Sequence, residues 1–192
     1  MTDVKVANGE LAAIVTFLEM RESPRVEVPS SELSLRRIEN PDPAQYRELF
    51  RKVGSPWLWF SRLIMDDARL TAIIGDPGVE LFTVTDGENE VGMLELDFRE
   101  VGECELSFVG LVPQLSGQGH GRWLLAEAIS RAWRDGIRRV HVHTCTLDHP
   151  AALSAYRRAG FTPYRREIER FPDPRLIGAL PRDCAPQIPL IG

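Results

Sequence analysis

Long hydrophobic runs and cysteines are scarce in this sequence of 192 residues. The longest charge-free apolar run near the N-terminus, residues 11–18, has eight residues, whereas a membrane-spanning helix needs about 18 or more. Asp3 and Glu10 do not fit the basic start of a secretory signal peptide. The three cysteines are widely spaced and form no CxxC pair, which indicates reduced thiols. We therefore expect a cytoplasmic protein with no membrane partner.

Basic residues are also in the minority. Lys and Arg number 23 against 28 Asp and Glu, a net charge of −5 at pH 7 that argues against a nucleic-acid partner. The charge is unevenly distributed, because residues 1–115 hold 11 basic and 21 acidic side chains and residues 116–170 hold 10 and 5. This gradient reflects either chance surface charge or a site where an anionic ligand meets a cationic one.

The apolar periodicity predicts an order of elements along the chain. It predicts strands over residues 12–18 and 33–38, helices that begin at Asp42 and Asp66, strands over 79–85, 91–98 and 104–112, a helix over 119–132, a strand over 139–146, a helix over 150–158 and a strand over 161–168. This order is typical of an α/β (α+β) fold with a central mixed antiparallel and parallel sheet flanked by helices. We expect one domain over residues 1–170, with its motif-bearing core at 79–170, and an extended, proline-rich arm over 171–192.

A glycine-rich turn leads from the strand over residues 104–112 into the next helix. The turn reads Gly117-Gln118-Gly119-His120-Gly121-Arg122. Glycines leave backbone N–H groups uncovered, and a helix start adds unpaired donors and a positive dipole end, so such a turn can hold a phosphate or pyrophosphate. The GxGxG spacing matches neither the dinucleotide-binding GxGxxG nor the P-loop. A tight strand-to-helix connection is the alternative explanation.

Two runs resemble motifs of the GNAT N-acetyltransferase superfamily. Residues 109–125 resemble motif A, whose loop reads [Q/R]xxGx[G/A], and the run HPAALSAYRRAGF at 149–161 is similar to motif B, N-x-x-A-x-x-x-Y-x-x-x-G-F. Two positions depart from these patterns, because Ser116 stands where the loop has Gln or Arg and His149 where motif B has Asn. Residues 1–40 and the tail lie outside the resemblance.

The resemblance implies a GNAT fold and an enzyme that transfers an acetyl group from acetyl-CoA to an amine by direct attack in a ternary complex. Acetyl-CoA is then a cosubstrate, and no metal is needed. The backbone of Val109 and Leu111 is implied to pair with the pantetheine amides, and the amides of residues 117–122 to bind the pyrophosphate. Arg122 is implied to add a positive charge there, and His149 to reach the pantetheine arm or the backbone beside it.

The resemblance also implies two catalytic side chains. Tyr156 falls on the motif B tyrosine that protonates the departing CoA thiolate, although a core aromatic is the alternative. Glu105 heads the motif A strand, where some GNAT enzymes carry a general base, and a solvated strand-end glutamate is the alternative. A further interpretation has His143 or His149 help to move the amine's proton.

One rival hypothesis concerns a metal. His141, His143 and Cys145 alternate along a predicted strand and therefore share one face, which leaves a zinc site open. Neighbours on one face of a strand stand about 7 Å apart, however, and this spacing strains a shared tetrahedral ion. We therefore expect no metal.

The acceptor stays open between small-molecule and peptide amines. Trp57, Trp59 and Phe60 fall where GNAT enzymes build the acceptor wall, although core packing also explains tryptophans there. The departures at Ser116 and His149 keep an alternative function, a non-catalytic acyl-CoA-binding sensor or interaction module on the same fold. The resemblance and the proline-rich tail are compatible with a homodimer.

Overall fold

The computed structural model describes residues 3 and 5–192 of the chain. Its strands are β1 (Glu10–Met20), β2 (Ser34–Arg37), β3 (Val79–Asp86), β4 (Asn89–Asp97), β5 (Glu103–Leu111), β6 (Arg139–Cys145) and β7 (Thr162–Pro172). Its helices are α1 (Pro43–Gly54), α2 (Asp67–Ile74), α3 (His120–Ala132) and α4 (Ala152–Arg158), with short 3-10 turns η1 (Ser55–Trp57) and η2 (Pro113–Leu115).

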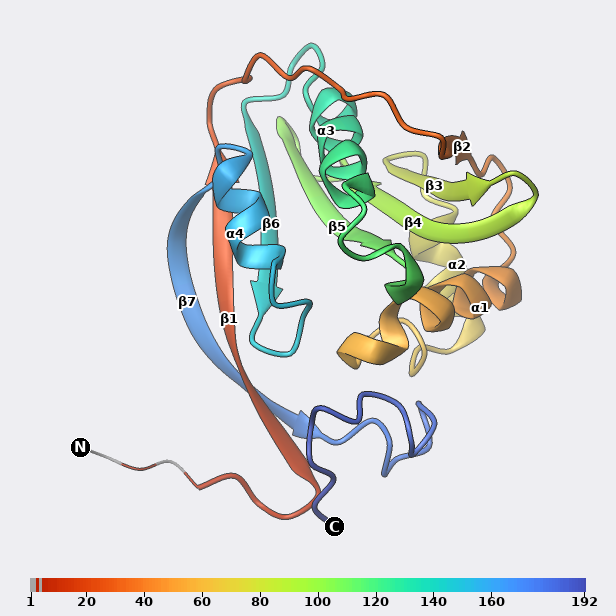
Figure 1. The fold of residues 1–192 in the computed structure, drawn as a ribbon, viewed down its shortest axis with the longest axis vertical. Helices are drawn as coiled ribbons and strands as arrows, with labels where there is room; N and C mark the ends of the chain where they lie inside the picture. The colour runs from red at the N-terminus through yellow and green to blue at the C-terminus, as the bar shows by residue number, and fades with distance from the viewer. Residues whose placement is uncertain (1–2, 4) are drawn as a thin grey trace.

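The strands form one sheet in the order β2-β3-β4-β5-β6-β1-β7 (Figure 1). Neighbours are antiparallel except β5 and β6, which are parallel. Helix α3 packs on one face over a core that contains Leu106, Leu124 and Val142. Helices α1 and α2 cover the other face around Phe50 and Leu70. The predicted mixed sheet flanked by helices is confirmed.

Helix α1 shows how local sequence sets these elements. The Asp42 side chain accepts hydrogen bonds from the backbone N–H groups of Ala44 and Gln45, and Pro43 occupies the first turn, where its missing N–H costs nothing. The inward face of the helix then buries four apolar side chains: Tyr46, Leu49, Phe50 and Val53. The helix therefore begins where the Asp42–Pro43 signal predicts, and it buries the face that the apolar spacing predicts.

Strand β1 lies inside the sheet, although it belongs to the part of the sequence outside the GNAT resemblance. It pairs antiparallel with β6 on one side and with β7 on the other. Its register with β7 shifts between Phe17 and Leu18, where β7 carries an extra residue, whereas its register with β6 is regular. Ala13, Val15 and Leu18 are buried. The N-terminal strand thus joins β7 to the rest of the sheet.

Strands β5 and β6 separate after a short paired segment. Their pairing covers only Glu103 to Glu105 against Arg139 to His141. Beyond it β5 continues along β4 to Leu111, whereas β6 continues along β1 to Cys145, and the two diverge in Figure 1. The edge of β5 that faces β6 is therefore open beyond this point.

The C-terminal segment differs from the extended arm that we expected. Strand β7 runs to Pro172, and residues 173–192 fold back in turns beside the start of β1 (Figure 1). A buried ion pair joins Asp173 and Arg175 at 2.7 Å. Leu180 is buried against Leu58, in the loop that follows η1. The segment therefore packs against the body next to that loop.

Candidate active site

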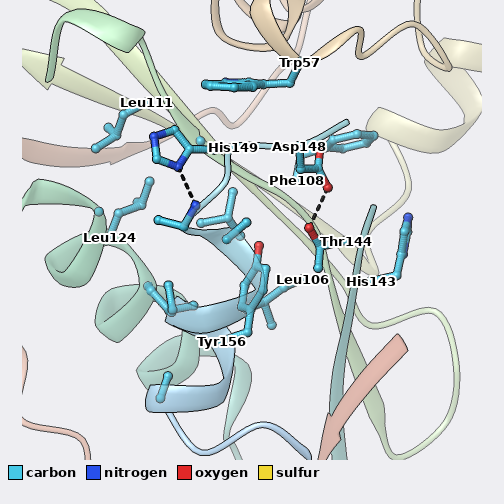
Figure 2. Close-up of a pocket in the computed structure, with 18 of the residues that line it drawn as sticks. Trp57, Leu106, Phe108, Leu111, Leu124, His143, Thr144, Asp148, His149 and Tyr156 are labelled. Atoms are coloured by element: carbon cyan, nitrogen blue, oxygen red, sulfur yellow. Dashed lines mark hydrogen bonds between the residues drawn. The ribbon is translucent and has the colours of Figure 1, made fainter. Parts of the chain in front are cut away.

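A cavity of about 1020 Å³ opens where β5 and β6 separate. The diverging strands, α3, α4 and the loop at residues 57–61 all contribute to its lining (Figure 2). Of the described residues predicted to bind a cofactor, the lining includes Val109, Leu111, Gly117, Gly119, Gly121, Arg122 and His149. Two segments far apart in the sequence, motif A and motif B, therefore meet around one space.

The glycine loop presents bare backbone to this cavity. Gly117 and Gly119 have φ angles of 80° and 88°, in the left-handed region that favours glycine. A Cβ added at either residue would meet no atom within 4 Å. Among the described residues, the backbone N–H groups of residues 117–121 have no acceptor. Five amides are therefore available to an anion at the start of α3.

The side chains of Gln118 and His120 lie elsewhere. Gln118 donates from Nε2 to the carbonyl of Gln114 at 2.9 Å, which closes the loop on itself. The His120 ring approaches the hydroxyl of Ser31, with Nδ1 and Oγ 3.4 Å apart. Both line a smaller hollow beside residues 29–32. These two residues therefore contribute only their backbones to the glycine loop.

His149 has a defined orientation just before α4. Its Nδ1 accepts the backbone N–H of Ala151 at 3.1 Å, so the neutral ring carries its proton on Nε2 (Figure 2). The ring also stands edge-on to Trp57, with centroids 4.9 Å apart. The position that motif B gives to Asn is therefore occupied here by a side chain that retains one N–H donor at the cavity.

Tyr156 extends from α4 with its hydroxyl toward the cavity (Figure 2). Its ring packs edge-on against Phe161, with centroids 5.8 Å apart. Burial, with a smaller contribution from the charge of Asp148, raises the pKa of Tyr156 above its ordinary value. The phenol therefore keeps its proton at neutral pH and is a hydrogen-bond donor.

Glu105 pairs with a histidine that the motif alone did not connect to it. Its Oε1 lies 3.1 Å from Nδ1 of His143, across the point where β5 and β6 separate. Burial favours a higher pKa for Glu105, but the hydrogen bond with His143 and the charges of His143 and His141 together outweigh it and lower the pKa. The same hydrogen bond raises the pKa of His143 against the opposing effect of burial. Of the two, His143 lines the cavity.

Asp148 is a further residue that the sequence analysis missed. Its Oδ2 accepts from the Thr144 hydroxyl at 2.7 Å and from the Cys145 backbone N–H at 2.8 Å. Its Oδ1 accepts from Trp59 Nε1 at 3.0 Å. Asp148 therefore ties the end of β6 to the loop after η1. The sequence signal that could have pointed to Asp148 is its position directly before the motif B run.

The three aromatic residues predicted for an acceptor wall all line the cavity. The Trp59 ring lies 5.2 Å from Phe108, and the Phe60 ring lies 5.0 Å from Phe171, centroid to centroid. Aromatic side chains from the loop at residues 57–61, from β5 and from β7 therefore meet at one end of the cavity.

Within residues 3 and 5–192, no group of three or more His, Cys, Asp or Glu side chains is arranged to hold a metal ion. The imidazoles of His141 and His143 instead lie beside Glu103 and Glu105, respectively. No helix in the described part of the chain is long and apolar enough to cross a bilayer.

The family model described as "Acetyltransferase (GNAT) family" matches residues 36–161, which include the glycine loop, Glu105 and Tyr156. The chain belongs to the GNAT family. The GNAT model leaves out β1 and everything after Phe161. No curated protein matches the sequence.

Solved structures show the same fold at low sequence identity. A GCN5-related N-acetyltransferase from Sphaerobacter thermophilus has a TM-score of 0.62 and 21% identity over 83% of this chain and 51% of its own. An acetyltransferase from Thermus thermophilus has a TM-score of 0.51 and 21% identity over 72% of this chain and 97% of its own. The aminoglycoside acetyltransferase meta-AAC0020, from an uncultured soil metagenomic sample, has a TM-score of 0.54 and 19% identity over 67% and 87%. The chain thus spans about half of the Sphaerobacter protein.

Proposed function

We propose that this GNAT protein transfers an acetyl group from acetyl-CoA to an amine by direct attack in a ternary complex. The observation that carries the proposal is the convergence of three features on one cavity: the bare amides of the glycine loop, the open edge of β5 and the hydroxyl of Tyr156. These features fit acetyl-CoA, because a diphosphate needs N–H donors, an amide-bearing arm needs an open strand edge, and a thiolate leaving group needs an acid.

Most of the proposed contacts to acetyl-CoA come from backbone groups. The amides of residues 117–121 would hold the pyrophosphate, and Arg122 would add positive charge beside it. Val109 and Leu111 stand on the open edge of β5, where an extended pantetheine arm can pair as an added strand. The Nε2–H of His149 is a donor for a carbonyl of that arm.

Tyr156 supplies the proton for the leaving group. A thiol has an ordinary pKa of about 8.5 and a phenol of about 10. A phenol held in contact with the departing thiolate can therefore donate its proton to the sulfur. Because burial keeps Tyr156 protonated, the acid is present at neutral pH. Free N–H groups at the cavity would polarise the thioester carbonyl.

The acceptor end needs a proton acceptor. Restricting reaction to the neutral form of an amine with a pKa of about 10.4 costs roughly 4.6 kcal/mol at pH 7. The Glu105–His143 pair stands at this end and takes that proton. We propose that the acceptor is a small-molecule or peptide amine, whose cationic form the aromatic faces and the Glu169 carboxylate attract. The aminoglycoside acetyltransferase neighbour, solved in complex with sisomicin, is consistent with such an acceptor.

The setting of the activity is part of the same proposal. All three cysteines are free thiols, as a reducing cytoplasm would keep them. We propose a cytoplasmic enzyme without a nucleic-acid partner. A homodimer is compatible with the fold.

The test measures CoA release from acetyl-CoA with polyamines, aminoglycosides, amino acids and peptides as acceptors. We expect turnover with at least one class, a loss of turnover in Tyr156→Phe and a lowered turnover in Glu105→Gln. Tyr164→Phe is the matched control, because Tyr164 is half-exposed on β7, away from the cavity. Calorimetric binding of acetyl-CoA without CoA release for any amine would refute the enzyme and favour the sensor.

A further inference from the structure

The Glu105–His143 pair places the imidazole between the carboxylate and the cavity. The 3.1 Å contact joins Oε1 to Nδ1 across the separation of β5 and β6. The cavity lining includes His143, whose side chain is 47% exposed, whereas Glu105 is not among the described residues that line it. An amine in the cavity therefore meets the imidazole before it meets the carboxylate.

The contact also decides which ring nitrogen is free. An ionised carboxylate only accepts hydrogen bonds, so Nδ1 carries a proton and donates it to Glu105. In the neutral ring the lone pair then lies on Nε2, the atom away from Glu105. Phe17 of β1 packs against the ring, with centroids 5.7 Å apart. The hydrogen bond to Glu105 thus leaves Nε2 as the basic nitrogen of the neutral ring.

The charges around His143 come from several elements. Glu105 on β5, Asp148 after β6 and Glu169 on β7 all raise its pKa, and burial lowers it. On its own strand, His141 lies near Glu105 and lowers the pKa of that carboxyl. On β7, Arg165 lies over the Phe17 ring at 3.9 Å. The three carboxylates outweigh the other influences, so the pKa of His143 lies above its ordinary value of about 6.5.

We infer that His143 is the catalytic base that takes the proton from the acceptor ammonium, and that Glu105 is a positioning residue that holds its imidazole. This inference rests on the proposed acetyl transfer. Nε2 takes one proton from the ammonium and passes it to water. The freed nitrogen lone pair forms the N–C bond while the electron pair of the C–S bond leaves on sulfur. The sulfur takes the Tyr156 proton, and the second proton of the nitrogen returns to Tyr156.

The experiment compares three variants by the pH dependence of kcat/KM, with acetyl-CoA and the best amine of the panel. We expect His143→Gln to lose about 10²–10⁴-fold in kcat, the usual worth of a positioned base, together with the acid limb of the profile. Glu105→Gln leaves the base in place but removes its charged partner, so its acid limb moves to lower pH. His141→Gln is the comparison on the same strand and face, and we expect it to keep the wild-type kcat and an acid limb, because His141 lies 3.6 Å from Glu103 and is not in the cavity lining.

An NMR titration of histidine-labelled protein without substrate adds a readout independent of turnover. The chain has four histidines, so single variants assign each signal. We expect the His143 midpoint to match the acid limb of kcat/KM, which reports the free enzyme, and to fall in Glu105→Gln. A midpoint that does not move in Glu105→Gln would overturn the pairing. A His143→Gln enzyme that keeps the wild-type kcat and acid limb, while Glu105→Gln loses both, would make Glu105 itself the base.

The two proposals can fail separately. If the wild-type protein releases no CoA with any amine, the proposed function fails, and the titration still decides whether Glu105 controls the imidazole. If the wild type turns over but His143→Gln keeps its profile, only the inference about the base fails.

Discussion

Tyr46→Phe is expected to lower the stability of the whole domain, because it removes one hydrogen bond from a buried ionic network. The Tyr46 hydroxyl donates to Glu95 Oε2 at 2.5 Å, and Arg62 Nη2 donates to Glu95 Oε1 at 2.6 Å. Glu95 is fully buried, and Tyr46 is 5% exposed. Burial, followed by the charge of Glu95, holds the pKa of Tyr46 well above its ordinary value, so the phenol stays a donor.

The structure sets the size of the effect. A hydrogen bond to a charged group contributes about 1.5–3 kcal/mol, and Glu95 is fully buried from bulk solvent. Urea slopes of about 1–3 kcal/mol per M convert this into a fall of roughly 1 M in the unfolding midpoint. Glu95→Gln should cost more, about 3–5 kcal/mol, since it leaves the Arg62 guanidinium without its buried partner.

Urea unfolding followed by circular dichroism measures these changes. Tyr164→Phe is the control, because this residue is 44% exposed and its substitution should stay within about 0.5 kcal/mol. The double variant Tyr46→Phe with Glu95→Gln should lose less than the sum of the two single losses, because both act on one network. Additive losses, or a Tyr46→Phe midpoint equal to that of the wild type, would refute the reasoning.

Two further predictions concern the loop and the C-terminal segment. Gly119 has a φ angle of 88°, so Gly119→Ala should lower the free energy of unfolding by roughly 1–2 kcal/mol. The added methyl group would project into the open loop, and we expect CoA binding, measured by calorimetry, to weaken about tenfold or more. Unchanged affinity would exclude the loop as the pyrophosphate site. Burial favours a higher pKa for Asp173, but the hydrogen bonds and charge of Arg175 outweigh it, so the folded pKa lies below the unfolded value of about 3.9. The contribution of the pair to folding stability is therefore present above a pH of about 3.9 and is lost as pH falls through the folded pKa. Asp173→Asn should therefore unfold at a lower urea concentration than the wild type at pH 7, and the difference between the two midpoints should narrow towards pH 3. A difference that stays constant with pH would contradict this linkage.

Local signals in the sequence predicted most elements, because caps and apolar spacing act within a few residues. The cap at Asp42 and the four apolar side chains after it give α1 both its start and its buried face. Strand β7 extends four residues beyond the predicted end at Ile168, and the reason is physical. Nearly all of its side chains are exposed, so backbone pairing with β1 forms the strand without a buried pattern to reveal it.

The site residues likewise divide into those that motif spacing predicted and contacts that only the folded structure reveals. Motif spacing pointed to Glu105 and Tyr156, and the structure places Glu105 where β5 and β6 separate and Tyr156 in the lining of the cavity. Glu105 and His143 are 38 positions apart in the sequence, and their pairing depends on the register of β5 against β6. The inward-facing hydroxyl of Tyr156 and the outward side chains of Gln118 and His120 likewise depend on packing. Sequence spacing does not encode such contacts.

The cavity is built from the range that the GNAT model matches and from the segments that flank this range. The glycine loop and α4 lie within residues 36–161, the range that the GNAT model matches. Outside that range, Phe17 of β1 packs on His143, and Phe171 of β7 packs on Phe60. The segment after β7 adds Leu180 against Leu58 in the same loop. The shared part of the fold thus builds the proposed cofactor end and also carries Glu105 and His143, whereas the flanking segments pack against the proposed acceptor end. We therefore expect the choice of amine to depend in part on residues outside the matched range.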